Sequence, residues 1–223
     1  MKKGHLLSSF IVFITAHSWW VLLSVVLAVS AMAAGVVNLG FKNDYRVYFS
    51  EENPQLQAFE EIQNTYNKSD SVMFVLQPKD GNVFSSETLQ AIQLLTEKSW
   101  KIPYSSRVDS VTNFQYTQAD GDDLLVADLV VDPMVSAVEL EKIKHIALHE
   151  PILANRLVSL SADVAGVNVV LQMPGDDPNE VSSVAAAARK LVKEIEAGYP
   201  GMKVYLTGMA MMSNAFSESA MND

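Results

Sequence analysis

Two histidines, His145 and His149, have the spacing best suited to metal chemistry. They lie four residues apart in the stretch HIALHE, so on a helix both imidazoles would lie on one face as potential metal ligands. A metal site needs at least one further ligand, and no glutamate directly follows His145, as a metalloprotease helix requires. We therefore expect both histidines to be solvent-exposed helix residues.

The acidic stretch DGDD at residues 120–123 is the second candidate, because carboxylates bind calcium. Its acids do not fall at the alternating positions of an EF-hand loop, so we expect a solvated turn. The chain has no cysteine, which excludes a disulfide framework, a thiolate metal site and a cysteine nucleophile. It also lacks G-x-S-x-G, P-loop and G-x-G-x-x-G motifs. The sequence therefore predicts no enzyme, no cofactor and no metal.

Charge is distributed unevenly along the 223 residues. Residues 1–41 contain Lys2 and Lys3 and no acidic residue, whereas the remainder contains 26 Asp and Glu against 14 Lys and Arg. A domain this acidic repels phosphate backbones, so no nucleic acid is expected as a partner.

An apolar segment, residues 19–37, is interrupted only by two serines. As a helix it would be roughly 28 Å long, which matches the hydrocarbon core of a bilayer. We expect one transmembrane helix here, with Trp19 and Trp20 as anchors at the membrane interface. Lys2 and Lys3 place the N-terminus in the cytoplasm by the positive-inside rule, and the acidic remainder then lies in the periplasm or another extracytoplasmic space.

Residues 1–18 are expected to form a cytoplasmic, juxtamembrane amphipathic segment, because Leu6, Phe10 and Ile14 share one helical face. A longer, tilted span is the alternative. A cleavable signal peptide is another, since residues 31–33 (Ala-Met-Ala) resemble its cleavage site. The apolar stretch is far longer than the ~7–15 residues usual in a signal peptide, so we favour the anchor.

Beyond Asp44 the sequence alternates between strand-like and helix-like runs. Helices are predicted over 55–67, from an N-cap at Ser85 to before Pro103, over 139–149, and over 178–198 with Asp177 as N-cap. Strands are predicted over 71–78, 107–114, 124–131, 166–173 and 203–207, with 115–123 as a polar connection. A β-α-β unit with a long crossover at each end of an open sheet is the split β-α-β, ferredoxin-like architecture, an α+β fold. The helix over 139–149 would be an insertion.

The order of three motifs carries a resemblance to a known family. DYRVYF (44–49) follows the apolar segment, VDSVTNF (108–114) lies in a predicted strand, and LTG (206–208) precedes the final stretch MAMMSNAFSESAMND. Together they resemble the N-terminal part of exporters of the resistance-nodulation-division (RND) superfamily, in its MMPL-like branch. The resemblance covers essentially the whole chain. One departure is Met209, because the family usually has proline after the glycine corresponding to Gly208.

The resemblance implies a periplasmic α/β porter-like domain over 44–208, followed at 209–223 by the lead-in to a second membrane helix, so the chain looks truncated. It implies a bacterial inner-membrane exporter of hydrophobic or amphiphilic, lipid-like substrates, driven by the proton-motive force. Its partners would be the remaining membrane helices and second porter domain of the full-length exporter, membrane lipid, the substrate, and a second copy or a periplasmic accessory protein. No substrate-binding residue is predicted.

The alternative is a single-span, membrane-anchored periplasmic α/β module that binds a protein or serves in assembly. Four methionines near the end of the chain are expected to pack against a neighbour rather than form a binding surface: Met209, Met211, Met212 and Met221. Residues 209–223 are expected to fray, because an apolar segment with nothing to pack against gains too little to offset its ordering entropy.

Overall fold

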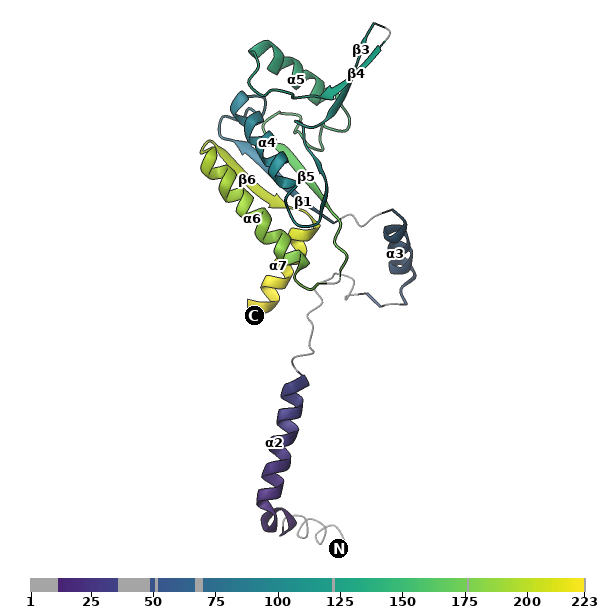
Figure 1. Cartoon of the computed structure of the whole chain (residues 1–223), viewed down its shortest axis with the longest axis vertical. Coiled ribbons are helices and arrows are strands. Elements are labelled where there is room, and N and C mark those ends of the chain that lie inside the picture. The colour runs from purple at the N-terminus through teal and green to yellow at the C-terminus, as the bar shows by residue number, and fades with distance from the viewer. Residues whose placement is uncertain are drawn as a thin grey trace. The chain divides into compact units, whose positions relative to one another are not determined.

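The structure is a computed structural model that describes residues 12–35, 49–50, 52–66, 70–121, 123–175 and 177–222. The chain divides into two compact units, Met1–Lys42 and Asn43–Asp223. The first contains helix α2 (Ser18–Gly35), and the second contains the elements from α3 (Pro54–Tyr66) onward (Figure 1). Of the motif DYRVYF, only Phe49 lies within the described residues.

Helix α2 has exposed apolar side chains along its whole described length, from Trp19 to Met32. Within the described residues, no helix combines the length and the apolarity needed to cross a membrane. The expected transmembrane helix over 19–37 is therefore not supported by the described part of the chain. Helix α2 ends at Gly35, and residues 36–37 lie outside that part. Of the expected juxtamembrane segment 1–18, residues 1–11 also lie outside it.

The second unit contains five described helices and six strands. After α3, the helices are α4 (Ser86–Ser99), α5 (Ala137–His149), α6 (Glu180–Gly198) and α7 (Met209–Asn222). The strands are β1 (Asp70–Pro78), β2 (Ser105–Asp109), β3 (Gln115–Asp120), β4 (Asp123–Asp128), β5 (Ala165–Leu171) and β6 (Met202–Thr207). The predicted α+β class is confirmed.

The main sheet has four strands in the order β2-β5-β1-β6, and every neighbouring pair is antiparallel. The unit β1-α4-β2 leaves room for β5 between its two strands, and β5-α6-β6 leaves room for β1. Each β-α-β unit is thus split by a strand of the other. The apolar run predicted as a buried central strand is β1, in which Val72, Phe74 and Leu76 are fully buried.

Helices α4 and α6 lie on one side of this sheet (Figure 1). Their apolar residues recur every three or four positions, so one face of each helix reaches the core. The core side chains from these helices are Leu89, Ile92 and Leu95 of α4 and Val184, Ala188 and Ile195 of α6. The predicted N-cap Ser85 is confirmed, because its hydroxyl accepts a hydrogen bond from the Thr88 backbone N–H at 3.2 Å.

The start of α6 differs from the prediction. The helix begins at Glu180 with Asn179 as N-cap, not at Pro178 with Asp177 as N-cap. The reason is a turn just before the helix, in which the buried Glu180 carboxylate accepts from the backbone N–H groups of Gly175 and Asp177. Asp177 in turn accepts from the Asn179 N–H at 2.8 Å, so its carboxylate stabilises this turn rather than the first turn of α6.

The insertion between β2 and β5 differs from its prediction more than the start of α6 does. The strand predicted over 107–114 ends at Asp109, and most of the connection predicted over 115–123 is strand β3. Strands β3 and β4 pair antiparallel as a separate two-stranded sheet. A hydrogen-bonded turn at residues 110–113 ends β2, and the polar residues of β3 are compatible with a strand whose faces are open to solvent.

The C-terminal stretch forms α7, so the expected fraying of residues 209–223 is wrong for the described part. Ala210 and Asn214 are buried, and the Arg189 guanidinium of α6 donates to both carboxylate oxygens of Glu218, at 2.5 and 2.9 Å. Packing on α6 therefore offsets the ordering entropy. Among the four methionines, Met211 packs against the core and Met209 and Met212 are exposed, while the side chain of Met221 lies outside the described residues.

Candidate functional site

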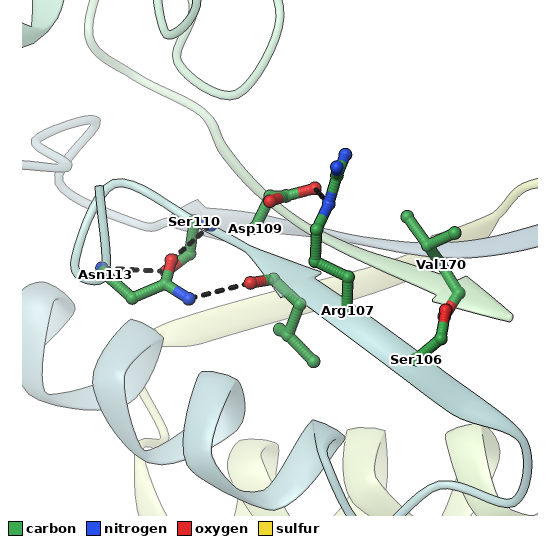
Figure 2. Close-up of polar contacts among 7 residues, drawn as sticks. Ser106, Arg107, Asp109, Ser110, Asn113 and Val170 are labelled. Atoms are coloured by element: carbon green, nitrogen blue, oxygen red, sulfur yellow. Dashed lines mark hydrogen bonds and ion pairs between the residues drawn. The ribbon is translucent and has the colours of Figure 1, made fainter. Parts of the chain in front are cut away.

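The VDSVTNF motif lies where the chain leaves the main sheet (Figure 2). Its first two residues belong to β2, where Val108 pairs with Val169 and Asp109 with Asn168 of β5. The following residues form a turn in which Ser110 and Thr112 are buried. Two of the seven motif residues are therefore strand, and the rest form the turn and connection that lead to the inserted hairpin.

Asn113 holds this turn closed. Its Oδ1 accepts from the Ser110 backbone N–H at 2.8 Å, and its Nδ2 donates to the Val108 carbonyl at 2.7 Å (Figure 2). An Asn side chain commonly replaces backbone partners in this way where a strand ends. The amide therefore satisfies two backbone groups that the sheet no longer pairs.

Buried hydroxyl groups connect the turn to α4. The Ser110 oxygen lies 2.9 Å from Thr96 Oγ1 and 2.8 Å from Thr112 Oγ1, and the Thr96 hydroxyl also contacts the Ile92 carbonyl at 2.7 Å. In the described part of the chain, the side-chain partners of Ser110 are hydroxyl groups and the Asn113 amide, none of which is a general base. This cluster therefore has a positioning role and is not an activated nucleophile.

Two charged side chains lie on the exposed part of β2. Arg107 Nε donates to Asp109 Oδ2 at 3.0 Å, and the Ser106 hydroxyl donates to the Val170 carbonyl at 3.1 Å (Figure 2). Because β2 is an edge strand, a charged pair here discourages pairing with another strand. The pair is largely solvated, so its contribution to stability is small.

The candidate metal ligands do not come together with a third one. His145 and His149 are exposed, as predicted, and their rings stack at 4.1 Å with His149 Nδ1 2.7 Å from the His145 carbonyl oxygen. Across the described residues, no group of three or more His, Cys, Asp or Glu is placed to hold a metal ion. The DGDD stretch is the turn of the β3–β4 hairpin, with Gly121 at φ +63°, and Asp122 lies outside the described residues.

The predicted interface anchors lie in the first turn of α2. Trp19 and Trp20 are both exposed there. Two consecutive exposed tryptophans are compatible with the anchoring role, and their contact with lipid stays a prediction.

The carboxylates whose pKa is shifted lie on the surface and have structural partners. Hydrogen bonds from the Ser159 and Ser161 hydroxyls lower the pKa of Asp163, and a hydrogen bond from Lys98 lowers that of Glu194. The Val204 backbone N–H lowers the pKa of Glu196, and Arg189 lowers that of Glu218 to about 2. All four shifts favour the charged form, so none prepares a carboxylate to act as a general acid or base near neutral pH.

Sequence reasoning identified the motif but missed the hydroxyl cluster. The available signal was Thr96, a polar residue on the face of α4 that also carries Ile92 and Leu95. The site can position the inserted hairpin on the sheet. No family model matches the chain, and no curated protein matches it either.

Proposed function

We propose that the chain is the N-terminal part of a proton-motive-force-driven, MMPL-like exporter of the RND superfamily. The second unit would be its first periplasmic porter domain, with a ferredoxin-like fold. The substrates would be hydrophobic or amphiphilic, lipid-like molecules. The proposal is carried by the motif order together with the split β-α-β topology, in which the hairpin and α5 interrupt the sequence between β2 and β5.

The passage from β6 into α7 supports this proposal. Gly208 has φ +108°, and a Cβ there would lie 2.5 Å from the Ser71 carbonyl oxygen of β1. The LTG motif therefore needs glycine to bring the end of the sheet directly into the next helix. On α7, Met209, Met212 and Phe216 form an exposed apolar stripe at helical spacing, which suits a lead-in to a further membrane helix.

The anchor is proposed from the sequence of residues 19–37 and from the charge asymmetry between the two units. The many exposed apolar side chains of α2 need an apolar environment, either lipid or protein. With the N-terminus in the cytoplasm, the acidic second unit would lie on the periplasmic side of a bacterial inner membrane.

Transport would need parts of the exporter beyond these residues. A proton path through a membrane requires ionisable side chains within it. Residues 19–37 contain none, so the relay would come from the remaining membrane helices. The porter domain, together with a second such domain, would then form part of the route by which substrate leaves the membrane.

Single-cysteine labelling tests the orientation, because the chain has no native cysteine. We expect Ala197→Cys, on an exposed position of α6, to react with a membrane-impermeant maleimide in intact spheroplasts. Ser8→Cys should react only after the membrane is permeabilised. Labelling of Ser8→Cys alone in intact spheroplasts, or a product recovered without residues 1–33, would overturn the proposed anchor.

Transport is tested with the complete reading frame that contains this chain. Cells expressing it should accumulate less N-phenyl-1-naphthylamine, a hydrophobic fluorophore, than cells with an empty vector. A protonophore should abolish the difference, and so should deletion of residues 70–208. If accumulation is unchanged although the protein reaches the membrane, the exporter proposal for this class of substrate is wrong.

The alternative is a membrane-anchored periplasmic module that binds another protein. One observation favours it specifically, namely the exposed aliphatic side chains of β4, which are unusual for an isolated hairpin. A reading frame that ends at Asp223, together with periplasmic labelling of Ala197→Cys, would make this alternative the better account.

A further inference from the structure

The β3–β4 hairpin has two edges without a strand neighbour in the described part of the chain. It forms a two-stranded sheet of its own and extends away from the main sheet (Figure 1). Its register pairs Tyr116 with Ala127, Thr117 with Val126, and Ala119 with Leu124. A two-stranded ribbon is only marginally stable by itself, so an additional strand at one edge would stabilise it.

The register defines which backbone groups of β4 face outward. The Leu129 N–H donates to the Phe114 carbonyl at the base of the hairpin. This bond makes Phe114 and Leu129 a hydrogen-bonded pair. Hydrogen-bonded and non-hydrogen-bonded pairs alternate along an antiparallel ladder. Counting from Leu129 along the register, Leu124 and Val126 therefore belong to non-hydrogen-bonded pairs. Their N–H and C=O groups therefore point away from β3 and are directed toward a potential neighbouring strand.

The two edges differ in their side chains. Strand β4 exposes three consecutive aliphatic residues, Leu124, Leu125 and Val126, with exposed fractions of 74%, 58% and 55%. Strand β3 presents mainly polar residues at its exposed positions, among them Thr117 and Gln118. An apolar edge strand with outward backbone groups binds other strands well, so β4 is the edge suited to docking.

The face of the hairpin toward α5 is already partly covered. Tyr116, Gln118 and Leu125 line a shallow recess together with Lys142 and Ile143 of α5. Leu124 and Val126 alternate with Leu125 and so lie on the opposite face. The surface open to a partner is therefore the outer edge of β4 with the side chains of Leu124 and Val126, which we call the β4 edge.

The charged residues at the two ends of β4 distinguish between a second copy of this chain and a different protein as the partner. Asp123 begins the strand and Asp128 ends it, and the Gln115 amide that donates to Asp128 adds no positive charge. Two copies paired along β4 would bring acidic ends together in either strand direction. Like charges at neighbouring cross-strand positions are destabilising, so the ends of β4 disfavour a second copy and favour cationic ends on a partner.

We propose that the β4 edge binds an extended aliphatic strand of another protein that carries Lys or Arg at its ends. The partner strand adds to the hairpin through the outward backbone groups of Leu124 and Val126. Its aliphatic side chains cover those of β4, and its basic ends pair with Asp123 and Asp128. This inference deepens the protein-binding alternative but does not depend on the absence of transport, since the exporter also leaves the β4 edge free for such a partner.

The test uses the full chain in detergent micelles and two short synthetic peptides. Both peptides alternate valine and threonine, and one has lysine at each end where the other has glutamate. Fluorescence anisotropy should show binding of the lysine-ended peptide. The glutamate-ended peptide should bind at least about tenfold more weakly, because both end pairs change from attractive to repulsive. Salt should reduce the difference.

Two proline variants locate the edge. Val126→Pro removes an outward N–H without breaking a hairpin hydrogen bond and should weaken binding by about tenfold or more. Thr117→Pro makes the same change at the directly opposite position, on the outer edge of β3. It should leave the affinity nearly unchanged, with both variants retaining the circular dichroism spectrum of the parent chain.

A charge reversal keeps the test decisive if Val126→Pro disturbs the hairpin. The double variant Asp123→Lys and Asp128→Lys should invert the preference, so that the glutamate-ended peptide binds more tightly.

Binding of neither peptide at millimolar concentration would overturn the proposal, and so would an equal loss of affinity in the two proline variants. Self-association that Val126→Pro abolishes, seen by sedimentation, would show that a second copy is the partner instead. The orientation and transport experiments are unaffected by any of these outcomes.

Discussion

Strands β1 and β4 are both rich in apolar residues, yet only β1 is buried. In β1, Val72, Phe74 and Leu76 are fully buried between two neighbouring strands and beneath α4 and α6. In β4, Leu124 and Val126 remain exposed, and β3 is the strand's one neighbour in the described part of the chain.

The difference shows that apolar composition alone does not bury a strand. Burial needs a second strand neighbour and a helical layer, which the split β-α-β units provide for β1. The hairpin lies in the insertion, where α5 borders only one of its faces. An apolar strand without a covering layer is a candidate for binding a partner, whereas one inside the sheet is simply core.

The largest expected effect contrasts the two strands directly. Phe74→Ala should reduce the free energy of unfolding by about 3–5 kcal/mol, because it leaves a cavity in the core. Leu124→Ala should change it by less than about 0.5 kcal/mol, since that side chain is mostly in solvent. Urea unfolding of the full chain in detergent, followed by circular dichroism, measures both, and similar values for the two variants would contradict the comparison.

The next effect concerns the contact between the end of β6 and β1. Gly208→Ala should cost about 1–3 kcal/mol of unfolding free energy beyond the backbone penalty, because its Cβ would collide with the Ser71 carbonyl. Gly81→Ala is the matched control, since Gly81 also has a positive φ, +67°, but has open space around an added Cβ. Gly81→Ala should lose only about 1–2 kcal/mol of unfolding free energy, because alanine is strained in the left-handed conformation. An equal loss in both variants would argue against a tight approach at Gly208.

A smaller effect is expected at the turn between the main sheet and the hairpin. Asn113→Ala removes the partners of the Ser110 N–H and the Val108 carbonyl and should cost about 1–3 kcal/mol of unfolding free energy. Asn113→Asp keeps the accepting oxygen and loses the donated hydrogen bond, so its cost should be smaller. Hydrogen exchange should show the hairpin amides less protected in Asn113→Ala while those of β1 change little. If the β1 amides lost protection to the same extent, the two sheets would open together rather than independently.

The smallest expected effect concerns the ion pair between helices α6 and α7, which belong to the same unit as β1. Glu218 has a pKa of about 2, below the ordinary 4.5, because it accepts hydrogen bonds from Arg189. Its stabilising contribution is therefore present above pH 4.5 and is lost as the pH falls toward 2. The melting temperature should fall less over this range in Glu218→Gln than in the parent chain. Glu97→Gln, an exposed change on α4, is the control and should follow the parent chain.

Much of the main sheet could be predicted from local patterns. The continuous apolar run of β1, the Ser85 N-cap of α4 and the apolar stripe of α6 each specify an element independently of the rest. The end of β2 at Asp109 could not be predicted, because it depends on Asn113 folding back onto Val108. The hydroxyl cluster was missed for a similar reason, since Thr96 and Ser110 meet only once α4 packs on the sheet.

The sequence alone determined the charge asymmetry, the apolar segment, and the type of most elements, because these depend on composition and on periods of two and 3.6 residues. Only the tertiary structure decided the strand order, the exposure of β4 and the helical state of α7. These three features depend on which surfaces meet, as Arg189 meets Glu218, and residues far apart in sequence make those contacts. Local sequence patterns do not specify such long-range contacts. Similar apolar runs therefore became a buried core strand in β1 and an exposed edge strand in β4.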